Sequence, residues 1–180
     1  MRTTAISRMP ARWFALIVVV LAMTTAPAAA GGASSPAAVN ACAAATNLHA
    51  MLCLVNQTRA AHGLPAVRMS SALLRSATLR ANAIVRCRQF SHTPCGQSFA
   101  SVFRAAGYAR GGYSVGENIA WGSGSLGSAQ QTLAAWLASP HHRRILLTRS
   151  WRELGVSMIG ANGLFAPGLN MVWVAQFGRR

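Results

Sequence analysis

The sequence of 180 residues contains no aspartate and no lysine, and its 17 basic residues are all arginines. Glu117 and Glu153 are its only acidic residues. A chain this poor in acids does not scatter carboxylates for solubility, so each glutamate is expected to have a local role. The scarcity also leaves few choices for a general base. The plainer alternative is that both glutamates pair with arginines, because ion pairs of purely structural value are common.

Several catalytic and metal-binding motifs are also missing. The chain has no H-E-x-x-H motif of zinc proteases. No C-x-x-C spacing occurs, which argues against a zinc site built on cysteines. The arginines are spread along the chain without a run of five or six, so the sequence does not indicate a dedicated nucleic-acid-binding module.

The amino-terminal residues have the features of a secretion signal. Three arginines precede an apolar run, Trp13 to Met23, that is too short to span a bilayer, and Ala28-Ala29-Ala30 offers a cleavage site. We therefore predict a signal peptide over 1–30, and a protein that is secreted to the extracellular space or to the periplasm and cell envelope. An uncleaved anchor is the alternative, but the shortness of the apolar run argues against it.

Composition then divides the rest of the chain. Residues 31–45 are rich in Ala, Ser, Gly and Pro and predict a flexible lead-in, and residues 46–180 predict one domain, expected to be a monomer. Cleavage after Ala30 leaves 150 residues with 14 arginines and two glutamates, a net charge of +12 with neutral histidines. Such a charge attracts anionic envelope surfaces such as phospholipid head groups or acidic wall polymers.

Four cysteines lie in this part of the chain. An even number in an exported domain predicts two disulfides, for which three pairings are possible. Sequence proximity favours Cys42–Cys53 and Cys87–Cys95, each closing a short loop. A zinc site is the rival interpretation.

Hydrophobic spacing predicts helices first and strands last. A helix is expected to start at Thr46 or Asn47 and to end at Gly63, and a second one starts at Ser70 or Ser71, with Arg80 off its buried stripe. A shorter helix is expected from Ser98, and another is capped by Ser128 and ends before Pro140. The glycine-rich segment 108–128 is expected to be a loop. Two strands of a hairpin follow, 154–158 and 170–177, so helices packed on a small antiparallel sheet are expected, an α+β fold.

Two histidine segments and both glutamates lie at predicted loops or element ends. His92 follows the second helix, His141 and His142 follow Pro140, and Glu153 precedes the first strand of the hairpin. Imidazole nitrogens and carboxylate oxygens are suitable ligands for zinc or a similar divalent ion. The same groups without a metal act as general acids and bases. Spacing alone does not decide between these uses.

The motifs together resemble the bacterial members of the CAP superfamily, also called SCP/TAPS, of cysteine-rich secretory proteins, antigen 5 and pathogenesis-related 1 proteins. The resemblance covers roughly residues 48 to 178. It rests on segments that follow one another in the family's order: Asn56-x-x-Arg59, Phe90-Ser91-His92, Gly116-Glu117-Asn118-Ile119, Trp136 with Ser139-Pro140-His141-His142-Arg143, Leu154-Gly155-Val156, and Trp173 to Gly178.

The resemblance implies an α-β-α sandwich with helices on both sides of a small antiparallel sheet and a central cavity. It implies that His92, Glu117, His142 and Glu153 line this cavity, with His92 and His142 as ligands of a divalent metal such as zinc. Glu153 has an alternative as partner of Arg143, Arg149 or Arg152. Arg59 is interpreted as bonding helix ends or loop carbonyls across the core, and Asn118 as organising its segment.

Three functions remain as hypotheses. The first is a binding or interaction module whose His/Glu cavity holds a divalent cation or a small apolar or lipid ligand; this form is not a classical enzyme. The second is an extracellular hydrolase of peptide or cell-wall polymer that uses Glu117 as general base. The third is a cationic surface-active protein that binds anionic membranes or wall polymers through charge alone.

Overall fold

A computed structural model describes Cys42 and residues 47–180. The predicted signal peptide over 1–30 lies outside these residues, as does the predicted lead-in over 31–45 apart from Cys42. In the described part of the chain, no helix combines the length and the apolar character that a membrane span requires.

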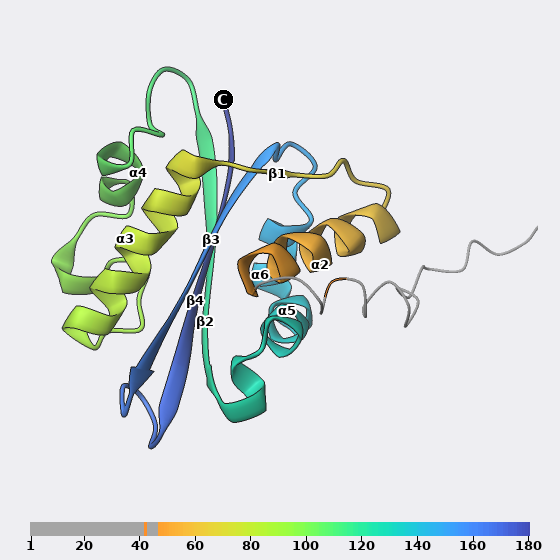
Figure 1. Cartoon of the computed structure of the whole chain (residues 1–180). Coiled ribbons are helices and arrows are strands. Elements are labelled where there is room, and N and C mark those ends of the chain that lie inside the picture. The colour runs from red at the N-terminus through yellow and green to blue at the C-terminus, as the bar shows by residue number, and fades with distance from the viewer. Residues whose placement is uncertain (1–41, 43–46) are drawn as a thin grey trace, which may run out of the picture. The chain divides into compact units, whose positions relative to one another are not determined.

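The described residues form three layers with a sheet in the middle (Figure 1). Helices α3 and α4 cover one face of the sheet, and α2, α5 and α6 cover the other. This arrangement confirms the predicted α+β sandwich. The elements in chain order are α2 (Asn47–Ala61), β1 (Arg68–Met69), α3 (Ser71–Cys87), η1 (Pro94–Gly96), α4 (Ser101–Ala105), β2 (Ser114–Ser123), η2 (Gly124–Gly127), α5 (Ala129–Ala138), α6 (Pro140–Leu146), β3 (Glu153–Asn162) and β4 (Leu169–Arg179).

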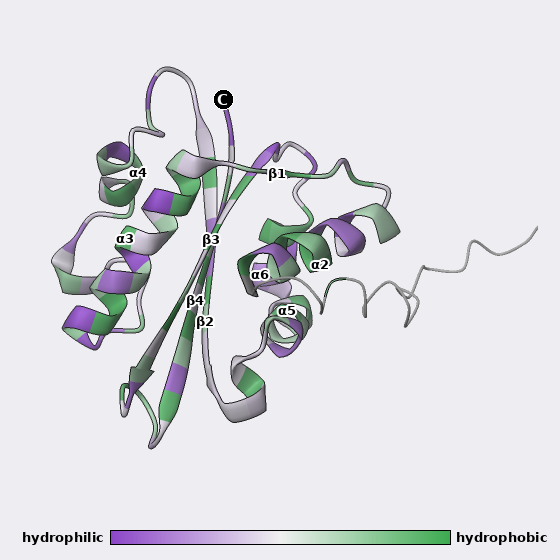
Figure 2. Ribbon diagram, viewed as in Figure 1, coloured by the Kyte–Doolittle hydropathy of each residue, from purple (hydrophilic) through white to green (hydrophobic). Residues whose placement is uncertain are grey.

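The strand order of the sheet is β1-β3-β4-β2. Strands β3 and β4 form the predicted hairpin, and β2 pairs antiparallel with β4, so that Glu117 lies opposite Gln176. The two-residue strand β1 runs parallel to β3, which makes the sheet mixed instead of antiparallel throughout. Hydrophobic residues follow the central strands, whereas hydrophobic and hydrophilic residues alternate around α3 (Figure 2).

Capping and periodicity explain the longer helices. Ser70 accepts a hydrogen bond from the Leu73 amide at the start of α3, and Ser128 accepts one from the Gln131 amide at the start of α5. Gly63 has φ 63° just beyond α2, the left-handed conformation that glycine adopts most easily. The starts of these helices match the predictions from the sequence.

The segment around Glu117 is a strand and not the predicted loop. All ten residues of β2 pair with β4, and the buried residues of β2 include Glu117, Asn118 and Ile119 in succession. A strand buried on both faces lacks the alternation of polar and apolar residues that would identify it. The strand holds Glu117 more rigidly than a glycine-rich loop would.

Helix α3 packs directly on β3. A Cβ atom at Gly155 would clash with the backbone of Leu73 and Leu74, so only glycine permits this approach. The close packing buries one face of α3, including Arg80, which the sequence placed off the buried stripe. This buried arginine is part of the candidate functional site.

Candidate functional site

Glu117 is the centre of a buried polar cluster. Its side chain is fully enclosed, and both of its oxygens accept hydrogen bonds. Arg80 Nε donates to Oε2 at 3.2 Å and Gln176 Nε2 donates to the same oxygen at 2.6 Å. The Nδ1 atom of His92 lies 2.7 Å from Oε1. A carboxylate with this many partners is a fixed structural anion whose charge Arg80 balances.

Arg80 is the functional residue that sequence reasoning missed. Its guanidinium donates to Glu117 and, through Nη2, to the Phe99 carbonyl at 2.8 Å. Its guanidinium carbon also lies 5.8 Å from the centre of the Phe99 ring. Arg80 thereby joins α3, β2 and the segment that precedes α4. The sequence does contain a signal for the burial of Arg80. Ser76, Arg80 and Ile84 are spaced four residues apart and therefore lie on one face of the helix.

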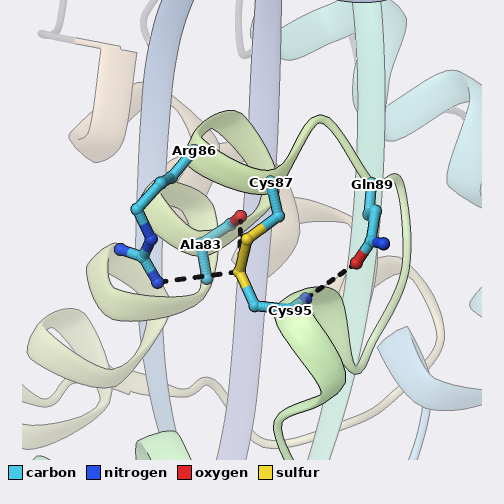
Figure 3. Close-up of a disulfide and its surroundings, with 5 residues drawn as sticks. All are labelled: Ala83, Arg86, Cys87, Gln89 and Cys95. Carbon is cyan, nitrogen blue, oxygen red and sulfur yellow. Dashed lines mark hydrogen bonds between the residues drawn. A yellow bond between two sulfur atoms is a disulfide. The ribbon is translucent and has the colours of Figure 1, made fainter.

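His92 projects from a segment that is fixed at both ends. The Cys87–Cys95 disulfide closes this segment, and the Cys95 amide donates to Gln89 Oε1 at 2.7 Å (Figure 3). The second disulfide joins Cys42 to Cys53, so the pairing that proximity favoured is confirmed. The side chain of His92 is 41% exposed. Its Nε2 atom makes no hydrogen bond to any described residue, so the nitrogen opposite Glu117 is available to a ligand.

A pocket of about 420 Å³ opens beside His92. We call it the His92 pocket. Two histidines and Glu117 supply the polar groups of the pocket, and aromatic and aliphatic side chains supply most of the rest. The lining residues are His92, Phe99, Val115, Gly116, Glu117, His141, Ile145 and Trp151. A Cβ atom at Gly116 would lie 3.0 Å from the Trp151 ring and 3.2 Å from Ile145, so the glycine keeps this wall open.

His142 is not among the residues that line the His92 pocket. Its neighbour His141 lines the pocket, whereas His142 Nδ1 lies 2.9 Å from Ser139 Oγ. Asn118 Nδ2 donates to the His142 carbonyl at 3.1 Å, which attaches α6 to β2 as the sequence suggested for Asn118. Burial lowers the pKa of His142, and the nearby His141 and His92 lower it further. His142 is therefore held as a neutral imidazole near His92.

Glu153 occupies a separate place, on β3, with β4 between it and the strand that carries Glu117. Tyr108 Oη donates to its Oε2 at 2.7 Å, and Arg68 and Arg180 both pair with its Oε1. Burial on its own would raise the pKa of Glu153, but hydrogen bonds from Tyr108, Arg180 and Arg68 outweigh burial and lower it. Glu153 therefore forms a structural ion pair, as the alternative interpretation of the sequence suggested. Its partners are Arg68 and Arg180, however, and not the three arginines suggested there.

Arg59 has the structural role expected of it. It is fully buried and donates to three carbonyls, those of Pro65, Leu146 and Thr148. Leu146 is the last residue of α6, where carbonyl groups have no partner within the helix. Arg59 thus fixes the end of the helix that carries His141 and His142.

The described residues contain no group of three or more histidine, cysteine, aspartate or glutamate side chains placed to hold a metal ion. Both glutamates are already neutralised by arginine. Zinc sites use three or four protein ligands, whereas the His92 pocket offers two imidazoles and the carboxylate of Glu117, which Arg80 already neutralises. A metal held by His92 and His142 thus remains a prediction that the donor set does not favour.

Comparisons with known proteins agree with this geometry. The model of the CAP family, described as the cysteine-rich secretory protein family, matches residues 52–177. No curated protein sequence matches significantly. Among solved structures, an outer surface protein of Borrelia burgdorferi aligns with a TM-score of 0.61 and 18% identity, covering 72% of this chain and 90% of that protein.

Two further structures show the same fold within longer chains. An extracellular protein of Bacillus anthracis that contains an SCP domain has a TM-score of 0.60 and 22% identity, and a cysteine-rich secretory protein of Staphylococcus aureus has 0.55 and 14%. Each alignment covers 74% of this chain but only 40% and 39% of those proteins. At these identities the structural likeness establishes the fold alone.

Proposed function

Because the chain belongs to the CAP family of cysteine-rich secretory proteins, we propose that it is an exported binding module whose His92 pocket holds a small apolar or lipid-like molecule. Export is supported by the two disulfides, since such bonds persist in oxidising compartments. The predicted signal peptide over 1–30 supports it independently.

The composition of the pocket is the observation that carries this proposal. Phe99, Val115, Ile145 and Trp151 form apolar walls around a volume of about 420 Å³, within the range of pockets that enclose small ligands. Trp151 is held in place, because its indole nitrogen donates to the Ile145 carbonyl at 2.9 Å. A preformed apolar wall favours binding, since little side-chain freedom is lost when the ligand enters.

The polar end of the ligand would lie near the two imidazoles. His92 Nε2 and the exposed His141 face an otherwise apolar pocket, and Arg80 balances the charge of Glu117 beneath it. A hydroxyl or carboxylate head group would bond to these imidazoles while its hydrocarbon part contacts Trp151 and Ile145. A short-chain fatty acid or a similar amphiphile has this chemistry.

A fluorescent fatty-acid probe tests the proposal on the mature protein. Ile145→Gln removes an apolar wall and is expected to weaken probe binding by about tenfold, since burying such a side chain stabilises by about 1.5–3 kcal/mol. The matched control is Leu169→Gln, a 53% exposed leucine that does not line the pocket. Absence of saturable binding to the wild type would refute the proposal, and so would equal binding by both variants.

The divalent-cation form of the proposal rests on the family resemblance. It needs His92 Nε2 together with His141 or His142 and additional donors from water or ligand. Zinc would then raise the melting temperature of the wild type, because a ligand that binds only the folded state stabilises it. His92→Ala would abolish this rise. An unchanged melting temperature and unchanged metal content would eliminate this form and leave the apolar ligand untouched.

The His92–Glu117 hydrogen bond favours one second candidate, an extracellular hydrolase acting on peptide or wall polymer. Glu117 is enclosed by three donors and is badly placed to take a proton from water. We assign the base to His92, oriented by Glu117 through Nδ1 with Nε2 facing the pocket. In a screen of such polymers, His92→Gln would abolish hydrolysis. Activity retained by His92→Gln would exclude this mechanism.

A further inference from the structure

A second hollow, of about 450 Å³, lies where β1, the start of β3 and the end of β4 meet. We call it the arginine hollow. It shares no lining residue with the His92 pocket, and its walls are Ala66, Val67, Arg68, Arg152, Glu153 and Arg180. Three guanidinium groups and one carboxylate give it a net charge of +2.

Both oxygens of the Glu153 carboxylate in the arginine hollow already have partners. Glu153 Oε2 accepts the hydrogen bond from Tyr108, and Oε1 lies 3.3 Å from Arg68 Nη2 and 3.4 Å from Arg180 Nη2. One oxygen therefore holds two guanidinium groups side by side. Since each guanidinium has five N–H donors, a single long contact leaves most of the donors of Arg68 and Arg180 for another acceptor.

Arg152 and Arg180 are also held in position before any ligand arrives. Arg152 donates through Nη1 to the Arg149 and Trp151 carbonyls, which leaves Nε and Nη2 without a hydrogen bond to any described residue. The guanidinium carbon of Arg180 lies 4.7 Å from the centre of the Tyr108 ring. Tyr108 is itself fully buried and lies against Gly178, so its ring is a rigid platform. Pre-positioned donors bind an anion with a smaller loss of side-chain entropy.

We propose that the arginine hollow is a binding site for a phosphate group. Guanidinium forks match phosphate oxygens in a bidentate geometry, and a phosphate carries enough charge to offset the excess of +2. Arg180 also lines an adjacent hollow of about 400 Å³ with Arg179, Tyr113 and Ser114, which gives a substituent on the phosphate room to continue. The same chemistry belongs to a free phosphate ester and to the head group of an anionic phospholipid.

The experiment is a titration of the mature protein with inorganic phosphate and glycerol phosphate by calorimetry. Sedimentation with phosphatidylcholine vesicles that contain or lack phosphatidylglycerol provides the lipid arm. The first variant is Arg68→Gln, whose side chain is 79% exposed, so that the fold is expected to remain intact. The second is Arg180→Gln, which is 45% exposed. The control is Arg104→Gln, which removes the same charge from α4, outside the hollow.

Each hollow variant is expected to weaken phosphate binding by about tenfold, the loss of one charge-assisted contact, whereas the control changes it by less than about twofold. Loss in the calorimetric arm identifies soluble phosphate, and loss in the vesicle arm alone identifies the lipid head group. Equal weakening by Arg104→Gln would show that net charge alone attracts the anion and would overturn the proposal. The absence of phosphate-dependent binding in both arms would overturn it as well. Neither result bears on the His92 pocket.

Discussion

Replacing Arg80 by methionine tests whether the buried ion pair beneath His92 holds the site together. Both side chains of the Arg80–Glu117 pair are fully enclosed, and Nε lies 3.2 Å from Oε2. Removing one partner of a buried pair costs about 3–5 kcal/mol, because the remaining charge loses its counter-charge without regaining water. Glu117 would keep its bonds to Gln176 and His92, so the lower figure applies.

A loss of about 3 kcal/mol lowers the melting temperature of a domain of this size by roughly 6–12 °C. The measurement is urea unfolding at neutral pH of Arg80→Met, Glu117→Gln and the double variant. The double variant should lose less than the sum of the two single losses, by about 1–3 kcal/mol, because it leaves no unpaired charge. Arg86→Met, an exposed arginine on the same helix, is the control and should change stability by less than about 0.5 kcal/mol.

The reasoning fails if Arg80→Met costs no more than Arg86→Met, or if the single losses add without coupling. Either outcome would mean that Gln176 and His92 anchor Glu117 without a contribution from Arg80. His92 would then owe its position to the Cys87–Cys95 disulfide instead of the ion pair. The two explanations are separable because the disulfide acts through the backbone of the His92 segment, whereas the ion pair acts through Glu117.

Three further predictions concern other parts of the domain. Arg59→Met would leave the carbonyls of Pro65, Leu146 and Thr148 without their donor and lower the free energy of unfolding by about 3 kcal/mol or more, measured by urea unfolding. Glu153→Gln would destabilise at neutral pH but lose its effect in acid. The folded-state pKa of Glu153 is lowered, so its stabilisation is present above the unfolded pKa near 4.3 and disappears as the pH falls through the folded value. The difference in melting temperature between the two proteins should therefore shrink as the pH falls below about 4.3, and a constant difference would contradict this. Replacing Cys87 and Cys95 by serine would cost about 2–3 kcal/mol for so short a loop and weaken probe binding at His92, which calorimetry and the fatty-acid probe would detect.

The helices could be predicted because their signals are local. Ser70 and Ser128 cap α3 and α5, and Gly63 ends the first helix, so a few neighbouring residues determine each boundary. Helix α6 was missed because Ser139 and Pro140 were interpreted only as the end of α5, although Pro140 also occupies the first turn of the next helix. Strand β2 was missed because its burial does not alternate.

The site was predictable only in part because its contacts are distant in sequence. The family motifs identified His92 and Glu117, which the structure places in hydrogen-bond contact. They did not identify Arg80, since an arginine beside an apolar stripe is assigned to solvent unless its acidic partner is known. Glu153 lies apart because its register places it opposite Gly178, where Tyr108 and Arg180 surround it, and no local pattern encodes that pairing.

The position of β4 has a consequence for when the sheet can be completed. Strand β4 lies between β3 and β2 and pairs with both, yet it follows them in the sequence. A chain that is synthesised amino end first cannot complete its sheet until residues 169–179 are available. Until then β2 has no strand to pair with, although α3 can already pack on β3. The late position of the central strand thus makes completion of the sheet depend on the last residues of the domain, and pairing of β2 with β4 is a contact between segments far apart in the sequence.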